Sequence, residues 1–199
     1  MKRILIGMIV VLASGLWSLP STAKAQQPLV IKPLAEKKVA ELPAGPLFWR
    51  IENFTARAQA QAAAGPWALV AESAGKVWLF TLGPAGVSSA GGTKVAEFGP
   101  IPRIIAPQYL LRINEASGPL GSMTPVHTHP GSEAFYVLAG EQSIRSPHGV
   151  MRVKVGQPEA GHGADMPMQV SSSGSTDLRS LVMFVVDATK PFSSPATFP

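Results

Sequence analysis

Residues 121–140 read GSMTPVHTHPGSEAFYVLAG, and this stretch decides the expected fold. His127 and His129 are two positions apart, so on a β-strand their side chains project from the same face. The Pro-Gly-Ser that follows predicts a turn, after which Glu133 opens a second apolar run. Two imidazoles and a carboxylate converging from adjacent strands form a ligand set for a first-row metal ion. We therefore predict a metal site at His127, His129 and Glu133.

Short apolar runs separated by turn residues make up most of the remaining sequence. The predicted strands are 47–54, 67–71, 76–82, 95–98, 108–114, 126–129, 134–139, 142–145, 150–155, 166–170 and 181–186. One short helix is predicted over 56–64, with Thr55 as its N-cap and Gly65-Pro66 as its stop. Many short strands with even turn spacing indicate an all-β sandwich or barrel.

The spacing G-x5-H-x-H-x3-E-x6-G resembles the first signature motif of the cupin superfamily. It is met at Gly121, His127, His129, Glu133 and Gly140. The resemblance implies an all-β fold, a single cupin-type jelly-roll β-barrel that here carries one short N-terminal helix. It also implies one divalent first-row transition metal inside the barrel, with Fe or Mn favoured and Zn, Ni or Cu as alternatives. A homodimer formed through the sheets is a further expectation from the resemblance.

The second cupin motif, roughly G-x5-P-x-G-x2-H-x3-N, is degenerate in this chain. Gly161 and Pro167 satisfy its opening spacing, but no histidine follows Pro167. Three alternatives remain open for the fourth ligand. Water completes a two-His-one-carboxylate site, or His162 folds in from a loop, or the thioether of Met168 takes part and favours copper.

Residues near the motif are expected to shape the site without performing chemistry. Phe135 and Val137 alternate with Glu133 and should line the interior, whereas Tyr136 should face the other way. Arg112 is a candidate to orient an anionic substrate, with a surface ion pair as the alternative.

Three further features outside the motif carry expectations. Gln169 is a candidate hydrogen-bond partner for a metal ligand. Residues 83–93 and the segment before Leu47 are candidates for covering the barrel mouth. His148 lies in a Ser-Pro-His-Gly turn and is expected to be exposed.

The N-terminal sequence predicts export from the cytoplasm. A basic start, an apolar stretch over 4–19 and an Ala-x-Ala ending at Ala25 are typical of a cleaved signal peptide. The predicted organisation is a signal peptide at 1–25, a linker or arm at 26–46, the barrel domain at 47–190 and a tail rich in proline and serine at 191–199. The mature protein is expected to be periplasmic or secreted and to have no membrane attachment.

Charge and cysteine content exclude several classes of protein. Residues 1–25 hold three basic residues and no acidic residue, so their removal lowers the net charge from +5 to +2. That balance, without clustered Lys or Arg, excludes a nucleic-acid partner. With no cysteine, the chain has neither disulfides nor thiolate ligands.

Two functions fit the predicted site. The first is a metal-dependent enzyme of the non-haem type, an oxygenase, isomerase or lyase that acts on a small molecule inside the barrel. The alternative is a non-catalytic module of the cell envelope that binds or senses a metal or a small ligand.

Overall fold

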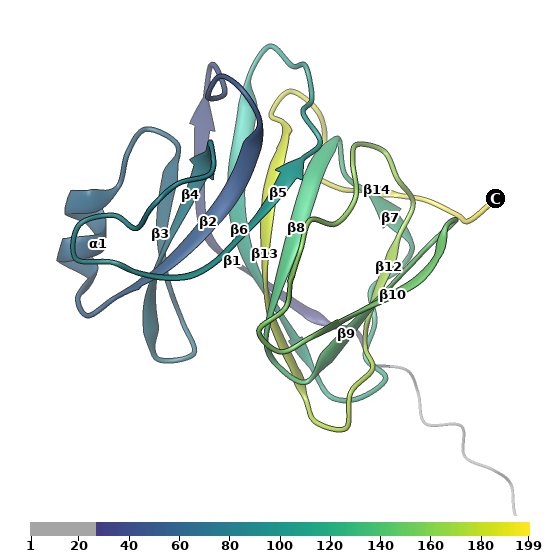
Figure 1. Cartoon of the computed structure of the whole chain (residues 1–199). Coiled ribbons are helices and arrows are strands. Elements are labelled where there is room, and N and C mark those ends of the chain that lie inside the picture. Colours follow the sequence, from purple (N-terminus) through teal and green to yellow (C-terminus); the bar gives the residue numbers. More distant parts are fainter. Residues whose placement is uncertain (1–26) are drawn as a thin grey trace, which may run out of the picture.

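The structure is a computed structural model that describes residues 27–199, and the predicted signal peptide lies outside these residues. Within them, the chain forms four β-sheets and one short helix (Figure 1). No closed barrel is found among the described strands. The predicted all-β class is confirmed. No helix in residues 27–199 has the length and apolar character needed to span a membrane.

A five-stranded antiparallel sheet forms the centre of the molecule. Its spatial order is β1-β6-β13-β8-β11. The bounds are Val30–Val39 (β1), Tyr109–Gly118 (β6), Leu178–Asp187 (β13), Gly131–Ala139 (β8) and Pro158–Glu159 (β11). Strands β8 and β13 are buried along almost their whole length, because both faces of this sheet are covered.

The first face of the central sheet packs against a four-stranded sheet of order β3-β4-β2-β5. Its strands are Ala68–Ser73 (β3), Lys76–Gly83 (β4), Leu47–Phe54 (β2) and Thr93–Ile101 (β5). Trp49, Trp78 and Phe80 of this sheet meet Tyr136 and Met183 of the central sheet in one apolar cluster. Large aromatic side chains fill this interface as a solid core.

The second face of the central sheet is covered by two smaller sheets, which Figure 1 shows on the side of the C-terminus. One has the order β10-β9-β12 and the other pairs β14 with β7. Their bounds are Glu141–Ser146 (β9), Gly149–Lys154 (β10), Gln169–Ser172 (β12), His127–Thr128 (β7) and Ser194–Pro195 (β14). Strict alternation along β8 decides which residues reach this face: Phe135 and Val137 do, whereas Tyr136 points to the four-stranded sheet, as predicted.

Residues 26–46, predicted as a linker or arm, contain the edge strand β1. It pairs antiparallel with β6 from Val30 to Val39, with an irregularity between Pro33 and Ala35. The strand shows no apolar alternation because most of its residues are exposed, and proline is tolerated at such an edge. The domain limits remain a prediction.

The only helix in the described residues is α1, Arg57–Ala63, which packs against the outer face of the four-stranded sheet. The prediction of Thr55 as N-cap was wrong. Ala56 occupies the N-cap position and no side chain caps the helix. The Thr55 hydroxyl instead donates to Oε1 of Gln59 at 2.7 Å, so it satisfies a side chain rather than a backbone amide.

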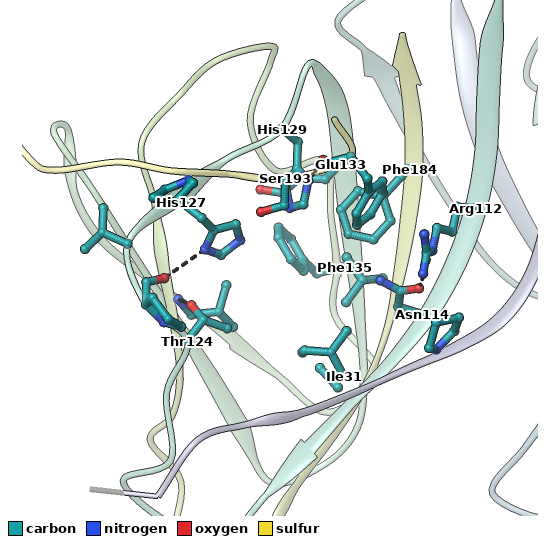
Figure 2. A pocket seen from close by; sticks show the side chains of 18 residues that line it. Ile31, Arg112, Asn114, Thr124, His127, His129, Glu133, Phe135, Phe184 and Ser193 are labelled. Carbon is teal, nitrogen blue, oxygen red and sulfur yellow. Dashed lines mark hydrogen bonds between the residues drawn. The ribbon is translucent and has the colours of Figure 1, made fainter. Parts of the chain in front are cut away.

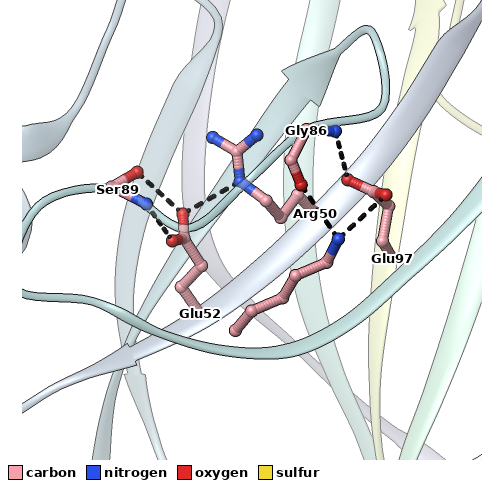
Figure 3. Close-up of polar contacts among 6 residues, drawn as sticks. Arg50, Glu52, Gly86, Ser89 and Glu97 are labelled. Atoms are coloured by element: carbon pink, nitrogen blue, oxygen red, sulfur yellow. Dashed lines mark hydrogen bonds and ion pairs between the residues drawn. The ribbon is translucent and has the colours of Figure 1, made fainter.

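The glycine- and serine-rich loop over 83–93 is fastened to the four-stranded sheet and does not line the cavity near the histidines (Figure 3). Glu52 accepts hydrogen bonds from the amide and hydroxyl of Ser89. Glu97 accepts one from the Gly86 amide, and Lys94 donates to the Gly86 carbonyl. The loop is therefore part of the half of the molecule that lacks the predicted site.

Candidate metal centre and cavity

His127 lies in β7 and His129 in the short segment between β7 and β8, and both imidazoles line one cavity (Figure 2). His127 exchanges two backbone hydrogen bonds of 2.9 Å with Met168, and β7 also pairs with β14. His129 is 5% exposed, and its carbonyl accepts from the Asp165 amide at 2.8 Å. The two imidazole rings meet edge to face with centroids 5.0 Å apart.

Both imidazoles are oriented by backbone carbonyl groups. Nδ1 of His127 lies 2.9 Å from the Pro125 carbonyl oxygen, and Nδ1 of His129 lies 2.6 Å from that of Phe192. A carbonyl oxygen can only accept a hydrogen bond, so each Nδ1 carries the proton. In the neutral ring, Nε2 then presents a lone pair, and this is the arrangement found in metal-ligating histidines.

Glu133 is almost fully buried on β8, with 2% of its surface exposed. Its backbone amide donates to the His162 carbonyl at 3.2 Å, but its Oε1 has no hydrogen-bond partner within residues 27–199. Burial without a compensating cation raises the pKa of this carboxyl to about 8. An ionised Glu133 thus requires a positive charge that these residues do not supply.

Burial acts on His129 in the opposite sense. Its ring packs between Phe184 and Phe192, with centroid distances of 4.8 and 4.7 Å. Desolvation by these apolar neighbours lowers the pKa of His129 to about 4, although the hydrogen bond to Phe192 opposes the shift. The imidazole is therefore neutral at physiological pH, as a metal ligand must be.

The three predicted ligands line one cavity of about 540 Å³ between the central sheet and its second-face cover. Figure 2 shows His127 on the left, His129 and Glu133 along the top with Glu133 beside Phe184, Phe135 in the middle, and Arg112 and Asn114 on the right. Within residues 27–199, however, no group of three His, Cys, Asp or Glu side chains is arranged to hold a metal ion. The structure brings the three residues to one cavity without closing them into a coordination sphere.

The two alternative ligands from the degenerate motif do not line this cavity. Met168 is 1% exposed and packs in the apolar cluster with Phe135. His162 lies in a loop against β8, and its Nε2 is buried without a hydrogen-bond partner in the described part of the chain. Gly161 allows that close approach, because a Cβ there would lie 2.5 Å from the Glu133 carbonyl oxygen. Gln169 donates to the Thr124 carbonyl rather than to a predicted ligand.

Two segments outside the motif complete the cavity. The segment before Leu47, a candidate for covering the barrel mouth, contributes Ile31 and Pro33 of β1 from the edge of the central sheet. Sequence reasoning missed the second segment. The tail after β13 returns across the site, where Phe192 contacts Phe184 at a centroid distance of 4.9 Å and Ser193 and Pro195 line the cavity. The proline-rich composition of the tail gave no signal of this role.

Comparison with known proteins yields similarities to solved structures. No family model matches the chain, and no curated protein matches it. A DMSP lyase from Ruegeria pomeroyi is 23% identical over 43% of each chain, with a TM-score of 0.38. A cupin-like protein from Thermotoga maritima is 12% identical over 44% of this chain and 65% of its own, with a TM-score of 0.39. An RmlC-like cupin from Methanocaldococcus jannaschii is 18% identical over 38% of this chain and 70% of its own, with a TM-score of 0.36.

The chain resembles cupin-fold proteins. This similarity extends over less than half of the chain. The chain also spans less than half the length of two DMSP lyase structures to which it is similar.

Proposed function

We propose that the chain is a metal-binding cupin in which His127, His129 and Glu133 hold one divalent first-row transition ion beside a small-molecule cavity. The observation that carries the proposal is the protonation pattern of the two histidines. Both Nδ1 atoms donate to backbone carbonyls, and both rings line the cavity that Glu133 also lines.

The donor set fits such an ion chemically. Two neutral imidazoles and one carboxylate suit Fe or Mn and also accept Zn, Ni or Cu. The unpartnered Oε1 of Glu133 supports the same assignment, because a buried polar atom without a partner costs free energy that a bound cation would offset. The three side chains do not form a closed triad, so binding requires side-chain adjustment.

The arrangement of the sheets supports a cupin-type jelly roll. In our proposal, the central sheet and the sheets of β9, β10 and β12 and of β7 and β14 are the two walls of a cupin-type jelly roll. The four-stranded sheet is then an addition packed outside it. We further propose that the protein is exported and works in the periplasm or outside the cell, after cleavage following Ala25.

A bound divalent ion supplies Lewis-acid or redox chemistry, which suits an oxygenase, isomerase or lyase acting on a small molecule. The chain's own residues bind and orient that molecule: Phe135 and Phe184 provide apolar walls, and the tail at Phe192 limits access of water. A non-catalytic binding module is the second candidate. It is favoured because the side chains of His127, His129 and Glu133 do not converge on one point.

Metal analysis of protein purified from the envelope fraction tests the proposal. We expect about one ion per chain in the wild type and a loss of at least about tenfold in affinity for His129→Ala and Glu133→Gln. His148→Ala is the matched control, since His148 is an exposed histidine outside the cavity. Unchanged metal content in both site variants would overturn the proposal. Reduced occupancy in His162→Ala would identify the fourth ligand, whereas full occupancy would leave that position to water.

Turnover separates the two candidate functions. The metal-loaded protein is incubated with phenolic, diketone and sugar-acid compounds, while thermal shifts report binding of the same compounds. Product formation that His127→Ala abolishes supports the enzyme. Stabilisation without any product supports the binding module.

A further inference from the structure

We infer that Arg112 and Asn114 form an anion-recognising subsite, so that the cavity selects a small carboxylate with an apolar body. This inference rests on the proposed function, since it names the class of molecule that would occupy the same cavity. Arg112 and Asn114 lie on the side of the cavity opposite His127 (Figure 2).

The sheet register places the two ends of the cavity in one row. Arg112 of β6 is directly opposite Phe184 of β13, and Phe184 is directly opposite Glu133 of β8. Residues opposite each other in neighbouring strands share a face, so all three project toward the cavity. Two strand spacings separate the backbones of Arg112 and Glu133 by about 10 Å. The cavity of about 540 Å³ that this row lines has room for a ligand with an apolar segment of several carbon atoms.

Arg112 is held in place and keeps donors for a ligand. Its Nε donates to Oδ1 of Asn114 at 3.0 Å, and its guanidinium stacks on the Phe192 ring at 4.4 Å from the centroid. Asn114 is itself buried, with 2% of its surface exposed. Stacking and a single hydrogen bond fix the plane of the guanidinium, while its remaining N–H groups match the two oxygens of a carboxylate.

The only acidic partner of Arg112 within residues 27–199 is a weak one. Nη1 lies 3.6 Å from Oε2 of Glu36 on the edge strand β1. The Glu36 side chain is 58% exposed, and ion pairs with exposed partners contribute little. A carboxylate ligand arriving from the cavity would therefore compete with Glu36 on favourable terms. Of the charged side chains that line the cavity, Arg112 is the only one with a permanent positive charge.

Binding of an isosteric pair tests the subsite. Hexanoate and hexanamide are titrated by calorimetry into the metal-free and the metal-loaded full-length protein. We expect hexanoate to bind more tightly than hexanamide in both forms, and Arg112→Gln to weaken hexanoate roughly tenfold to one-hundredfold while leaving hexanamide unchanged. Glu36→Gln removes the competing carboxylate and should strengthen hexanoate severalfold.

The outcomes separate this subsite from the metal centre. Equal binding of the two probes, or a preference that Arg112→Gln leaves intact, overturns the subsite. A preference seen only in the metal-loaded protein also overturns it, because the carboxylate would then bind the ion. Glu36→Gln provides a second measure if Arg112→Gln fails to fold. An unchanged hexanoate affinity in Glu36→Gln contradicts the inference. Metal content in both variants should equal that of the wild type, so a failed subsite leaves the metal proposal standing.

Discussion

Glu52 and Glu133 are both buried glutamates on β-strands, yet their surroundings differ in kind. Glu52, with no exposed surface, accepts hydrogen bonds from the Ser89 amide at 2.6 Å, the Ser89 hydroxyl at 2.9 Å and Nε of Arg50 at 3.2 Å (Figure 3). Glu133 leaves Oε1 without a partner in the described residues. The first carboxylate is satisfied by the protein and holds a loop in place. The second lines a cavity and remains available for a ligand.

The same contrast holds for the two faces of the central sheet. Toward the four-stranded sheet, buried tryptophan and phenylalanine side chains pack into one apolar cluster. Toward β7 and β14, a cavity of about 540 Å³ remains. A close-packed interior stabilises a fold, whereas a lined cavity with a few convergent polar groups is the usual form of a small-molecule site. Variants that remove single interactions on either face test this comparison.

Replacing Glu52 should have the largest effect on stability. In Glu52→Gln, the Arg50 guanidinium loses its charged partner and one Ser89 donor faces an amide that cannot accept it. We expect the free energy of unfolding in urea to fall by about 3 kcal/mol. Glu72→Gln is the control, because Glu72 pairs with Arg57 on the surface and should change stability by less than about 0.5 kcal/mol. Equal losses in the two variants would contradict the structural role of Glu52.

Replacing Glu133 should alter the pH dependence of the metal-free protein. With a folded pKa of about 8 against an ordinary 4.5, Glu133 stabilises the fold fully below pH 4.5 and loses this contribution as pH rises toward 8. His129 acts in the opposite direction: its contribution is complete above pH 6.5 and is lost as pH falls toward 4. Between pH 4.5 and 6.5, the changes of unfolding free energy with pH that come from Glu133 and from His129 therefore have opposite signs.

Above pH 6.5, only Glu133 of these two residues still makes the unfolding free energy depend on pH. The wild type should lose about 1.4 kcal/mol of unfolding free energy per pH unit from this group between pH 6.5 and 7.5. Glu133→Gln should abolish that slope, as measured by urea unfolding at several pH values after metal removal. A stabilising ion should flatten the slope of the wild type as well. Parallel pH profiles for wild type and variant would show that Glu133 does not hold a proton in the fold.

Shortening the tail should weaken metal binding without unfolding the protein. A chain ending at Pro191 lacks the Phe192 carbonyl that orients His129, and loss of such a partner costs roughly tenfold in metal affinity. A chain ending at Ala196 is the control, since it keeps Phe192 and β14 and removes Phe198, which stacks on Arg145. Metal titration should distinguish the two. Equal affinities would show that the tail does not position His129.

The smallest effect is expected at the start of α1. Thr55→Ala should change the unfolding free energy by less than about 0.5 kcal/mol, because Thr55 contacts only the Gln59 side chain. An N-cap threonine would instead contribute about 1 kcal/mol. A loss of that size in urea unfolding would restore the capping role that the sequence predicts and that the structure contradicts.

Local sequence patterns were sufficient to predict the structure where a single residue type or a single hydrophobic period determines the backbone conformation. The strand over Leu47–Phe54 was predicted with its observed bounds, because its buried and half-exposed residues partly alternate. Gly140 ends the first motif with a positive φ of 73°, and a Cβ there would lie 2.7 Å from the Asp177 carbonyl oxygen. Such positions require glycine whatever the rest of the chain does.

Prediction failed where a segment depends on distant partners. Strand β1 lies at an edge and is mostly exposed, so its sequence has no period to detect. The tail reaches the site because β14 pairs with β7, some 66 residues earlier in the chain. Each of these strands has two residues, which is too short to produce a recognisable strand pattern in the sequence. The position of Arg112 beside the cavity likewise depends on the register of β6 with β13.

The sequence by itself determined the all-β class and selected His127, His129 and Glu133, which the structure brings to one cavity. The prediction of adjacent strands joined by a Pro-Gly-Ser turn was wrong. Strand β7 pairs with β14, β8 pairs with β13 and β11, and Gly131 and Ser132 belong to β8. Only the tertiary structure decided that Glu133 is buried without a partner, that the tail orients His129, and that Arg112 lies at the far end of the same cavity. Burial, carbonyl contacts and cavity walls are made by residues far apart in the chain, and local sequence does not encode them.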